Sequence, residues 1–168
     1  APTTLLLDFH PEAPPLDRAT LQRLVVEAIA QPASQEPERS VEIPVHYGGP
    51  DLERVARHAS LSPEAVIERH HQGRYRVLCL GFAPGFPYLG GLDAALATPR
   101  LASPRSRVPA GSVAIGGDHT GIYSIPSPGG WNLIGQTSTT LFDPHTADLE
   151  KMFRLRAGDR VSFVPIDE

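Results

Sequence analysis

The sequence is poor in cysteine and in long apolar runs. Cys79 is its one cysteine among 168 residues, which excludes a disulfide within the chain and a metal site built from several cysteines. A single cysteine also suits a reducing compartment. Apolar runs such as Val77–Leu80 are short, whereas a helix that crosses a membrane needs about 20 apolar residues. We therefore expect a cytoplasmic protein without a membrane partner.

Positive charge is also scarce. The chain has 15 Lys and Arg against 19 Asp and Glu, a formal net charge of −4. Binding to nucleic acid of any sequence depends on Lys and Arg that neutralise phosphates. The segment Asp51–His71 has the pattern of a helix-turn-helix, but its second helix would bring two Glu and one Arg to the groove. We therefore expect no nucleic-acid partner.

The motifs of nucleotide and metal sites are missing. Gly116 and Gly121 have the outer spacing of a phosphate-binding loop, but Ile and Tyr follow where Lys and Ser or Thr are required. We therefore do not expect this chain alone to bind ATP. His70 and His71 are adjacent, so on a helix they point about 100° apart and cannot hold one ion together. No metal site is predicted.

Candidate nucleophiles also lack the required surroundings. Ser112 and Ser127 lie within two residues of a glycine, but neither lies in a G-x-S-x-G motif. Cys79 lies in an apolar stretch, where burial would make the thiol unreactive. The residues therefore predict no catalytic group, and the catalytic residues stay unassigned.

The first part of the chain reads as a fragment of a domain. We expect a strand over Thr3–Phe9 and a helix that Asp17 caps and that runs to about Ala30, because its apolar residues recur on one helical face. One strand and one helix cannot close a core, so residues 1–30 are predicted to be the end of an N-terminal α+β domain that begins upstream. Residues 31–40 are polar and without period, which predicts a linker.

The rest of the chain, residues 41–168, changes from helical to β-type patterns. A strand over Val41–Tyr47 precedes two short helices, and the second begins with Ser62 as its cap and Pro63 in its first turn. A buried strand is expected over Tyr75–Phe82. Short strands separated by turn residues indicate a barrel or sandwich. The later strands are expected at Ser112–Ile115, Gly121–Ile125, Trp131–Thr137 and Arg160–Pro165.

The segment Gly81–Thr137 concentrates glycines and aromatic residues. It holds 11 of the 15 glycines and 5 of the 11 aromatic residues. A barrel with tight corners explains many of these glycines. Aromatic residues beside turns nevertheless indicate a pocket or a partner surface. Arg100, Arg105 and Arg107 lie in the same segment, and their guanidinium groups suit a carboxylate or phosphate.

Three blocks in this segment resemble the signature of one family. They read GFAPGFPYLGGL (81–92), TPRLASPRSRVPAGSVAIGG (98–117) and TGIYSIPSPGGWNLIGQT (120–137). Together they closely resemble the B subunit of bacterial 5-oxoprolinase, long labelled allophanate hydrolase subunit 1. The same family includes the inhibitor of a sporulation histidine kinase, and a related module occurs within urea carboxylase. The resemblance runs from about Val41 to Ile166.

The resemblance implies a mainly β fold: a cyclophilin-like β-barrel of the carboxyltransferase type over residues 41–168, after the partial α+β domain. It also implies a protein complex with a paralogous barrel subunit of the C type and a lactam-opening subunit of the A type. That complex is a hydrolase that uses ATP to convert 5-oxoproline into glutamate, and this subunit is expected to be inactive alone. Two alternatives stay open. The chain could inhibit a sensor histidine kinase through an apolar groove, or serve in allophanate or urea amide hydrolysis.

The resemblance also directs attention to a groove for a substrate or partner. We expect Arg105 to bind a carboxylate, the backbone at Gly111 and Ser112 to donate hydrogen bonds, and Tyr123 and Trp131 to form walls. The apolar, aromatic character of the first block suits a protein partner equally well.

Three positions depart from the family pattern. LIGRT reads LIGQT here, with Gln136 in place of Arg, and QTGIYP reads HTGIYS, with His119 and Ser124. Either Arg105 takes over anion recognition or this member has a different ligand or a reduced activity. The groove residues expected are Phe82, Pro84, Phe86, Tyr88, Arg100, Arg105, Gly111, Ser112, His119, Thr120, Tyr123, Gly129, Gly130, Trp131 and Gln136.

Overall fold

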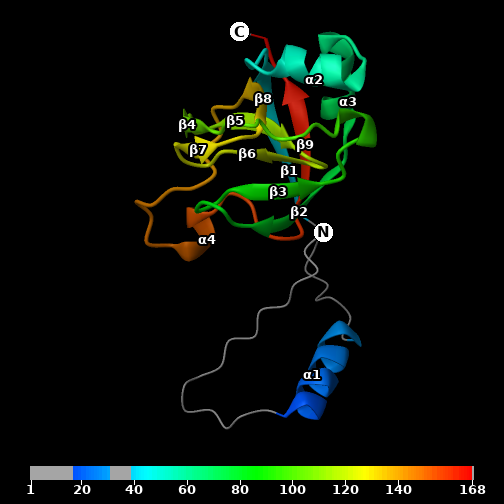
Figure 1. Cartoon of the computed structure of the whole chain (residues 1–168). Helices are drawn as coiled ribbons and strands as arrows, with labels where there is room; N and C mark the ends of the chain where they lie inside the picture. Colours follow the sequence, from blue (N-terminus) through cyan, green and yellow to red (C-terminus); the bar gives the residue numbers. More distant parts are fainter. Residues whose placement is uncertain (1–16, 31–38, 168) are drawn as a thin grey trace. The chain divides into compact units, whose positions relative to one another are not determined.

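The computed structural model describes residues 17–30 and 39–167 (Figure 1). They belong to two separate compact units, which are described individually. The strand expected at Thr3–Phe9 and nearly all of the linker expected over 31–40 lie outside the described residues. In the first unit, helix α1 (Arg18–Ala30) begins as expected, because the Oδ1 atom of Asp17 accepts a hydrogen bond of 2.7 Å from the Thr20 amide.

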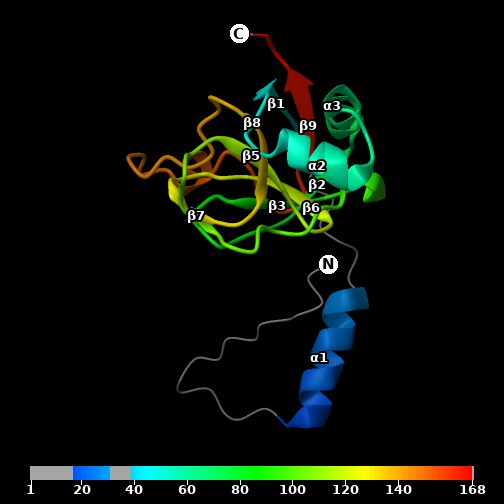
Figure 2. The ribbon, with the colours of Figure 1, turned by 45° about the horizontal axis from the view of Figure 1, so that its top comes forward.

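The second unit is a closed β-barrel in which seven strands follow the order β1-β8-β5-β6-β3-β2-β9 (Figures 1 and 2). Strands β1 and β9 pair in parallel, and every other pair in the barrel is antiparallel. The expected mainly β fold is thus confirmed. The strands are β1 (Ser40–Tyr47), β2 (Tyr75–Leu80), β3 (Pro87–Gly90), β5 (Ser112–Gly116), β6 (His119–Ile122), β8 (Asn132–Gln136) and β9 (Arg160–Pro165).

A small two-stranded sheet accompanies the barrel. It pairs β4 (Arg105–Val108) with β7 (Ser127–Gly129). The sequence predicts neither of these strands, nor β3, because they are short and contain charged residues, proline or glycine. Two short helices also escape prediction, η1 (Ala94–Leu96) and α4 (Leu149–Met152). Sheet pairing rather than local propensity forms these strands.

Helices α2 (Leu52–Ala59) and α3 (Pro63–Gln72) pack against β8 and β9 at one end of the barrel (Figure 1). The expected start of α3 is confirmed, since the Ser62 hydroxyl accepts a hydrogen bond of 3.2 Å from the Ala65 amide and Pro63 occupies the first turn. Of the described residues, no helix is both long and apolar enough to cross a membrane.

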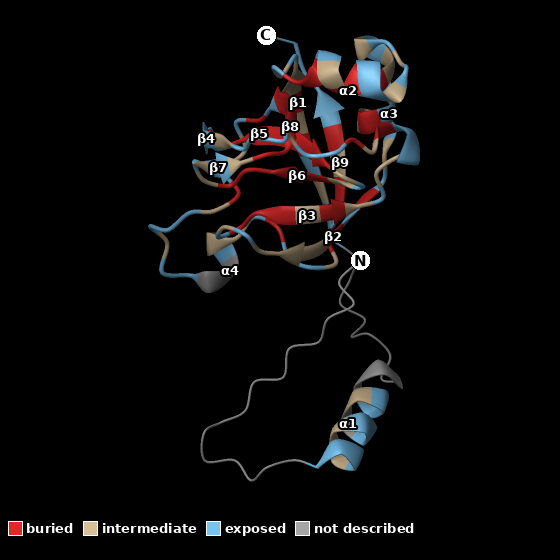
Figure 3. Ribbon diagram, viewed as in Figure 1, coloured by how far each residue is buried: buried red, intermediate tan, exposed pale blue. Residues whose placement is uncertain are grey.

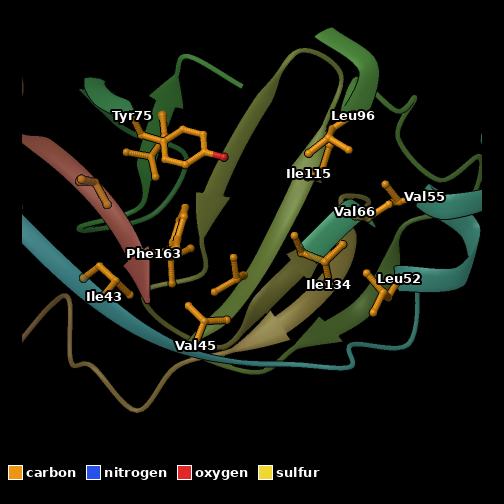
Figure 4. Close-up of a cluster of buried hydrophobic side chains, with 14 of the residues drawn as sticks. Ile43, Val45, Leu52, Val55, Val66, Tyr75, Leu96, Ile115, Ile134 and Phe163 are labelled. Atoms are coloured by element: carbon orange, nitrogen blue, oxygen red, sulfur yellow. The ribbon is translucent and has the colours of Figure 1, made fainter. Parts of the chain in front are cut away.

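The barrel interior holds the main hydrophobic core, as the burial colours of the strands show (Figure 3). Ile43 and Val45, alternate residues of β1, point into the same interior as Phe163 of β9, which is how a small barrel fills its centre (Figure 4). The core includes Ile43, Val45, Ile115, Ile134 and Phe163, each at most 2% exposed.

A second hydrophobic cluster lies on the opposite face of β5 and β8. Ala114 and Leu133 belong to it, whereas their neighbours Ile115 and Ile134 belong to the main core. Val108 of β4 joins this cluster, so the small sheet covers the outer surface of the barrel here. The remaining members are aromatic, and they form the site described below.

The strand expected over Tyr75–Phe82 is shorter than expected. Strand β2 ends at Leu80, because Phe82 has a φ of 67° and cannot continue an extended strand. The expectation that Cys79 is buried is wrong. Cys79 is half-buried, as are the other two of the last three residues of β2.

His70 and His71 each have a partner of their own. The ring of His70 is fully buried, where Nε2 lies 2.9 Å from Thr120 Oγ1 and Nδ1 lies 2.7 Å from Tyr47 Oη. Thr120 donates its own proton to the Ala114 carbonyl, so His70 Nε2 is the donor and Tyr47 donates to Nδ1. Burial lowers the pKa of His70 to about 3, so this histidine is a neutral core residue. His71 pairs at the surface with Glu68.

Candidate functional site

The second cluster surrounds a small pocket with a volume of about 70 Å³. Its walls come from the loop after β2, from β3, from the segment after η1, and from β7 and the turns beside it. All eight lining residues belong to the groove expected from the sequence. They are Phe82, Phe86, Tyr88, Arg100, Tyr123, Gly129, Gly130 and Trp131. We call this hollow the aromatic pocket.

Phe86 is the centre of the aromatic pocket. Its ring is 2% exposed and meets four other aromatic rings edge to face. The centroid distances are 5.1 Å to Tyr88, 5.3 Å to Tyr123, 5.3 Å to Trp131 and 5.4 Å to Phe82. Each such pair contributes about 0.5–1.5 kcal/mol beyond the area it buries. These contacts fix the relative positions of the walls.

Glycines make room for these rings. A Cβ atom at Gly116 would overlap the indole of Trp131, and a Cβ atom at Gly129 would overlap the hydroxyl of Tyr123. Neither glycine has a positive φ, so close packing rather than backbone conformation requires them. At these two positions a glycine is therefore required by an aromatic side chain that packs against it.

Arg100 supplies positive charge to the aromatic pocket. Its guanidinium carbon lies 5.6 Å from the ring centroid of Trp131, a cation–π geometry. Burial raises the pKa of the Tyr123 phenol, while a hydrogen bond with the Trp131 backbone and the charges of Arg100 and Arg105 partly oppose that rise. Tyr123 is therefore neutral near pH 7 and can donate a hydrogen bond. The pocket thus combines a cation, a phenol and flat apolar walls.

Arg105, the expected carboxylate partner, does not line this pocket. Its Nη2 atom lies 2.8 Å from Oδ1 of the buried Asp51, in an ion pair across 54 residues of sequence. The other oxygen of Asp51 accepts a hydrogen bond of 2.7 Å from the Leu133 amide. Through Asp51, Arg105 therefore links strand β4 of the small sheet to strand β8 of the barrel. The sequence offers no local signal that Asp51 would be its partner.

Gly111, Ser112 and Gln136 form a separate cluster at the start of β5. Ser112 Oγ donates to Gln136 Oε1 at 3.2 Å, and Gln136 Nε2 donates to the Ala110 carbonyl at 2.6 Å. Gly111 has a φ of 80°, and a Cβ atom there would collide with the Thr137 carbonyl. Gln136 thus binds the backbone of the turn, at the position where the family pattern has Arg.

The other expected residues are spread around the barrel. Thr120 is fully buried and bound to His70, away from any surface. His119 pairs with Asp118, with Nδ1 2.6 Å from Oδ1. The hydroxyl of Ser124, another departure from the family pattern, donates to the Pro84 carbonyl at 2.6 Å and so holds the loop after β2.

A larger apolar hollow of about 440 Å³ adjoins the loop after β2. Phe82 and Pro84 were expected in the groove, whereas Leu80 and Phe153 were not. Phe153 comes from the chain beyond α4, far from the signature blocks, so no sequence pattern could have indicated it. We call this larger hollow the outer hollow. It is lined by Leu80, Gly81, Phe82, Ala83, Pro84, Gly85 and Phe153.

Sequence comparison agrees with this architecture. Residues 1–152 match the family model described as carboxyltransferase domain, subdomain C and D. The chain therefore belongs to the carboxyltransferase family of C and D subdomains.

The curated relatives include the 5-oxoprolinase B subunit of Bacillus subtilis, 56% identical over 133 residues that cover 77% of this chain and 54% of the relative. The Haemophilus influenzae protein of the same name is 46% identical over 164 residues, which cover 96% of this chain and 74% of the relative. These relatives confirm the resemblance to the B subunit of 5-oxoprolinase. The matches span 54% and 62% of the lengths of the B. subtilis and Escherichia coli relatives.

Solved structures share the fold. A conserved uncharacterized protein from Pyrococcus horikoshii is 47% identical, with a TM-score of 0.73 over 89% of this chain and 68% of that chain. The urea amidolyase of Kluyveromyces lactis is 20% identical, with a TM-score of 0.68 over 89% of this chain and 11% of that chain. At this identity the second likeness concerns the fold alone.

Proposed function

We propose that this chain acts as part of a B-type subunit in an ATP-dependent amide hydrolase that converts 5-oxoproline into glutamate. The identity of 46–56% with proteins named as B subunits of 5-oxoprolinase supports this assignment. The aromatic pocket supports it independently, because its chemistry suits a small, flat anion.

The observation that carries the proposal is the position of Arg100 over Trp131. An arginine fork can pair with a carboxylate through two hydrogen bonds. The faces of Trp131 and Tyr88 can pack against a flat ring. 5-Oxoproline has both parts, a carboxylate and a lactam ring. In this assignment Arg100, rather than Arg105, receives the carboxylate, because Arg100 lines the aromatic pocket and Arg105 does not.

The lactam amide is stabilised by resonance, so its opening at neutral pH requires activation. In the proposed reaction the amide oxygen attacks the γ-phosphate of ATP and releases ADP. Water then adds to the activated carbon and the ring C–N bond breaks, which leaves the γ-carboxyl group of glutamate as an acyl phosphate. A second water hydrolyses this acyl phosphate and releases phosphate. The ATP site belongs to the assembled complex, whose other proposed members are a paralogous barrel protein of the C type and a lactam-opening protein of the A type. This chain contributes the pocket for the ring and carboxylate.

The test is 5-oxoproline-dependent ATP hydrolysis by the full-length protein mixed with its C-type and A-type partners. Activity is expected only with all of these proteins present, and Arg100→Ala is expected to reduce it strongly. Arg57→Ala is the matched control, since Arg57 is an exposed arginine on α2 outside the pocket. Full activity of Arg100→Ala would refute the role of Arg100. Absence of activity from a complete mixture would refute the substrate assignment.

The outer hollow favours a second candidate, inhibition of a sensor histidine kinase. Its lining is mainly apolar, and Phe82 at its edge is 61% exposed, which suits the apolar face of a partner helix. The purified protein would then reduce autophosphorylation of such a kinase, and Phe82→Ala would weaken the effect. A kinase that keeps its full activity in the presence of excess protein would argue against this function.

A further inference from the structure

The aromatic pocket is too small for the ligand that its walls suit. Its volume of about 70 Å³ lies far below the range of about 300–1,000 Å³ that is usual for small-molecule sites. Three of its walls, Phe86, Tyr123 and Trp131, are at most 5% exposed and are held by contacts between their rings. Entry of a ligand therefore requires the movement of a wall, and only Phe82 and Arg100 among the lining residues are exposed.

Phe82 lines both the aromatic pocket and the outer hollow, and it is the one residue that their linings share. Its ring is 61% exposed. It meets Phe86 at 5.4 Å and Tyr123 at 6.3 Å, both of which belong to the aromatic cluster. Exposed side chains change rotamer within nanoseconds. Rotation of this ring would join the two hollows, and the outer hollow alone has about 440 Å³.

The backbone at Phe82 is held in an unfavourable conformation. Its φ is 67°, and the Ala83 amide donates to the Gly81 carbonyl at 2.8 Å, which closes a three-residue γ-turn with positive φ. Such turns are rare and strained for residues other than glycine. Hydrogen bonds from Gly81 to Phe86 and from Phe86 to Ala83 keep the turn in place. Glycine would fit this turn without strain, so the turn itself gives no reason for a phenylalanine.

We propose that Phe82 is a movable partition that controls access to the aromatic pocket and sets the size of the ligand it admits. With the ring in its present position the pocket has a volume of only about 70 Å³. With the ring rotated, the pocket and the outer hollow form one site of the size that a small cyclic carboxylate needs. The class of ligand rests on the proposed function, whereas the role of Phe82 as a partition does not.

Trp131 provides the measurement, because it is the one tryptophan of the sequence, lines the aromatic pocket and is 5% exposed. Acrylamide quenching of its fluorescence reports whether small solutes reach the pocket. Phe82→Gly is expected to raise the quenching constant at least about twofold, because the strained turn keeps its shape while the partition is lost. Phe82→Leu, with a smaller side chain, is expected to give an intermediate value. Ile166→Ala removes a side chain that is 39% exposed and lies outside both hollows, so it should behave like the parent protein.

A second measurement tests the role of Phe82 independently of the identity of the ligand. Stopped-flow fluorescence of Trp131 after mixing with 5-oxoproline should show faster association for Phe82→Gly than for the parent protein. If quenching rises in Phe82→Gly but 5-oxoproline does not bind any variant, the partition stands and the proposed substrate fails. If quenching in Phe82→Gly and Phe82→Leu equals that of the parent protein, the partition is refuted, whatever the substrate.

Discussion

The guanidinium of Arg100 lies over the indole of Trp131, 5.6 Å from the ring centroid. Among the described residues it has no hydrogen-bond partner, so its N–H groups remain available to a ligand. Arg105, five residues later, uses one of its N–H groups on Asp51 and joins two parts of the fold. Two arginines from one signature block thus have different roles, and the fold decides which one reaches the pocket.

Replacing Arg100 should weaken the binding of a carboxylate. We expect Arg100→Ala to raise the Kd for 5-oxoproline about tenfold or more, because a charged hydrogen bond contributes about 1.5–3 kcal/mol. Arg100→Lys should recover part of the affinity, since lysine keeps the charge but lacks the planar fork. Titration monitored by Trp131 fluorescence measures both values. An unchanged Kd for Arg100→Ala, matching that of the Arg57→Ala control, would assign the carboxylate to another residue.

Substitution of the neighbouring residues Gly129 and Gly130 by alanine should change the free energy of unfolding by different amounts. A Cβ atom at Gly129 would overlap the Tyr123 hydroxyl, whereas a Cβ atom at Gly130 has its nearest neighbours at 3.6 Å. We expect Gly129→Ala to lower the free energy of unfolding by about 1–3 kcal/mol through overpacking. Gly130→Ala should change it by less than about 0.5 kcal/mol. Urea unfolding measures both, and equal effects would contradict the packing described for Tyr123.

Removing Asp51 should destabilise the barrel unit. Its carboxylate binds Arg105 and the Leu133 amide, so Asp51→Ala leaves a partly buried guanidinium and a backbone N–H without their acceptor. We expect a loss of about 2–3 kcal/mol, less than for a fully buried pair because the Arg105 side chain is 30% exposed. Asp118→Ala is the control, because its side chain is 82% exposed. Similar unfolding free energies for the two variants would show that the Asp51 pair contributes little.

The stability of the barrel unit should fall in acid because of His70. Burial lowers its folded-state pKa to about 3 from an ordinary value near 6.5, so between these values the unfolded chain binds a proton that the folded protein does not. The contribution of His70 is therefore complete above about pH 6.5 and is lost as the pH falls, by up to about 1.4 kcal/mol per pH unit.

Urea unfolding between pH 4 and pH 8 measures this dependence. His70→Gln should be less stable at pH 8, because the buried hydrogen bonds to Tyr47 and Thr120 are disturbed, but it should show a shallower loss in acid. His58→Gln is the control, since His58 is exposed on α2. A parent-like slope in His70→Gln would mean that other groups cause the acid sensitivity.

Local signals in the sequence predict the elements that local interactions define. Ser62 and Pro63 mark the start of α3, and Asp17 marks the start of α1, because a cap needs only a side chain and the amide a few residues further on. The apolar strands β1, β5, β8 and β9 were also predictable, since their β-type residues alternate or run together. The short strands β4 and β7 were not, because they exist only through their pairing with each other.

The sequence by itself determined the family and the β-rich second unit, because signature blocks and short strands with turn residues between them are visible without a structure. The groove that it predicts includes the eight residues that line the aromatic pocket. Tertiary structure decided that Arg105 pairs with Asp51, that Thr120 lies buried against His70, and that Phe82 lines two hollows. The first two pairs join residues 54 and 50 positions apart. Closure of the barrel brings such residues together, and that closure depends on the whole set of strand pairings rather than on any local pattern.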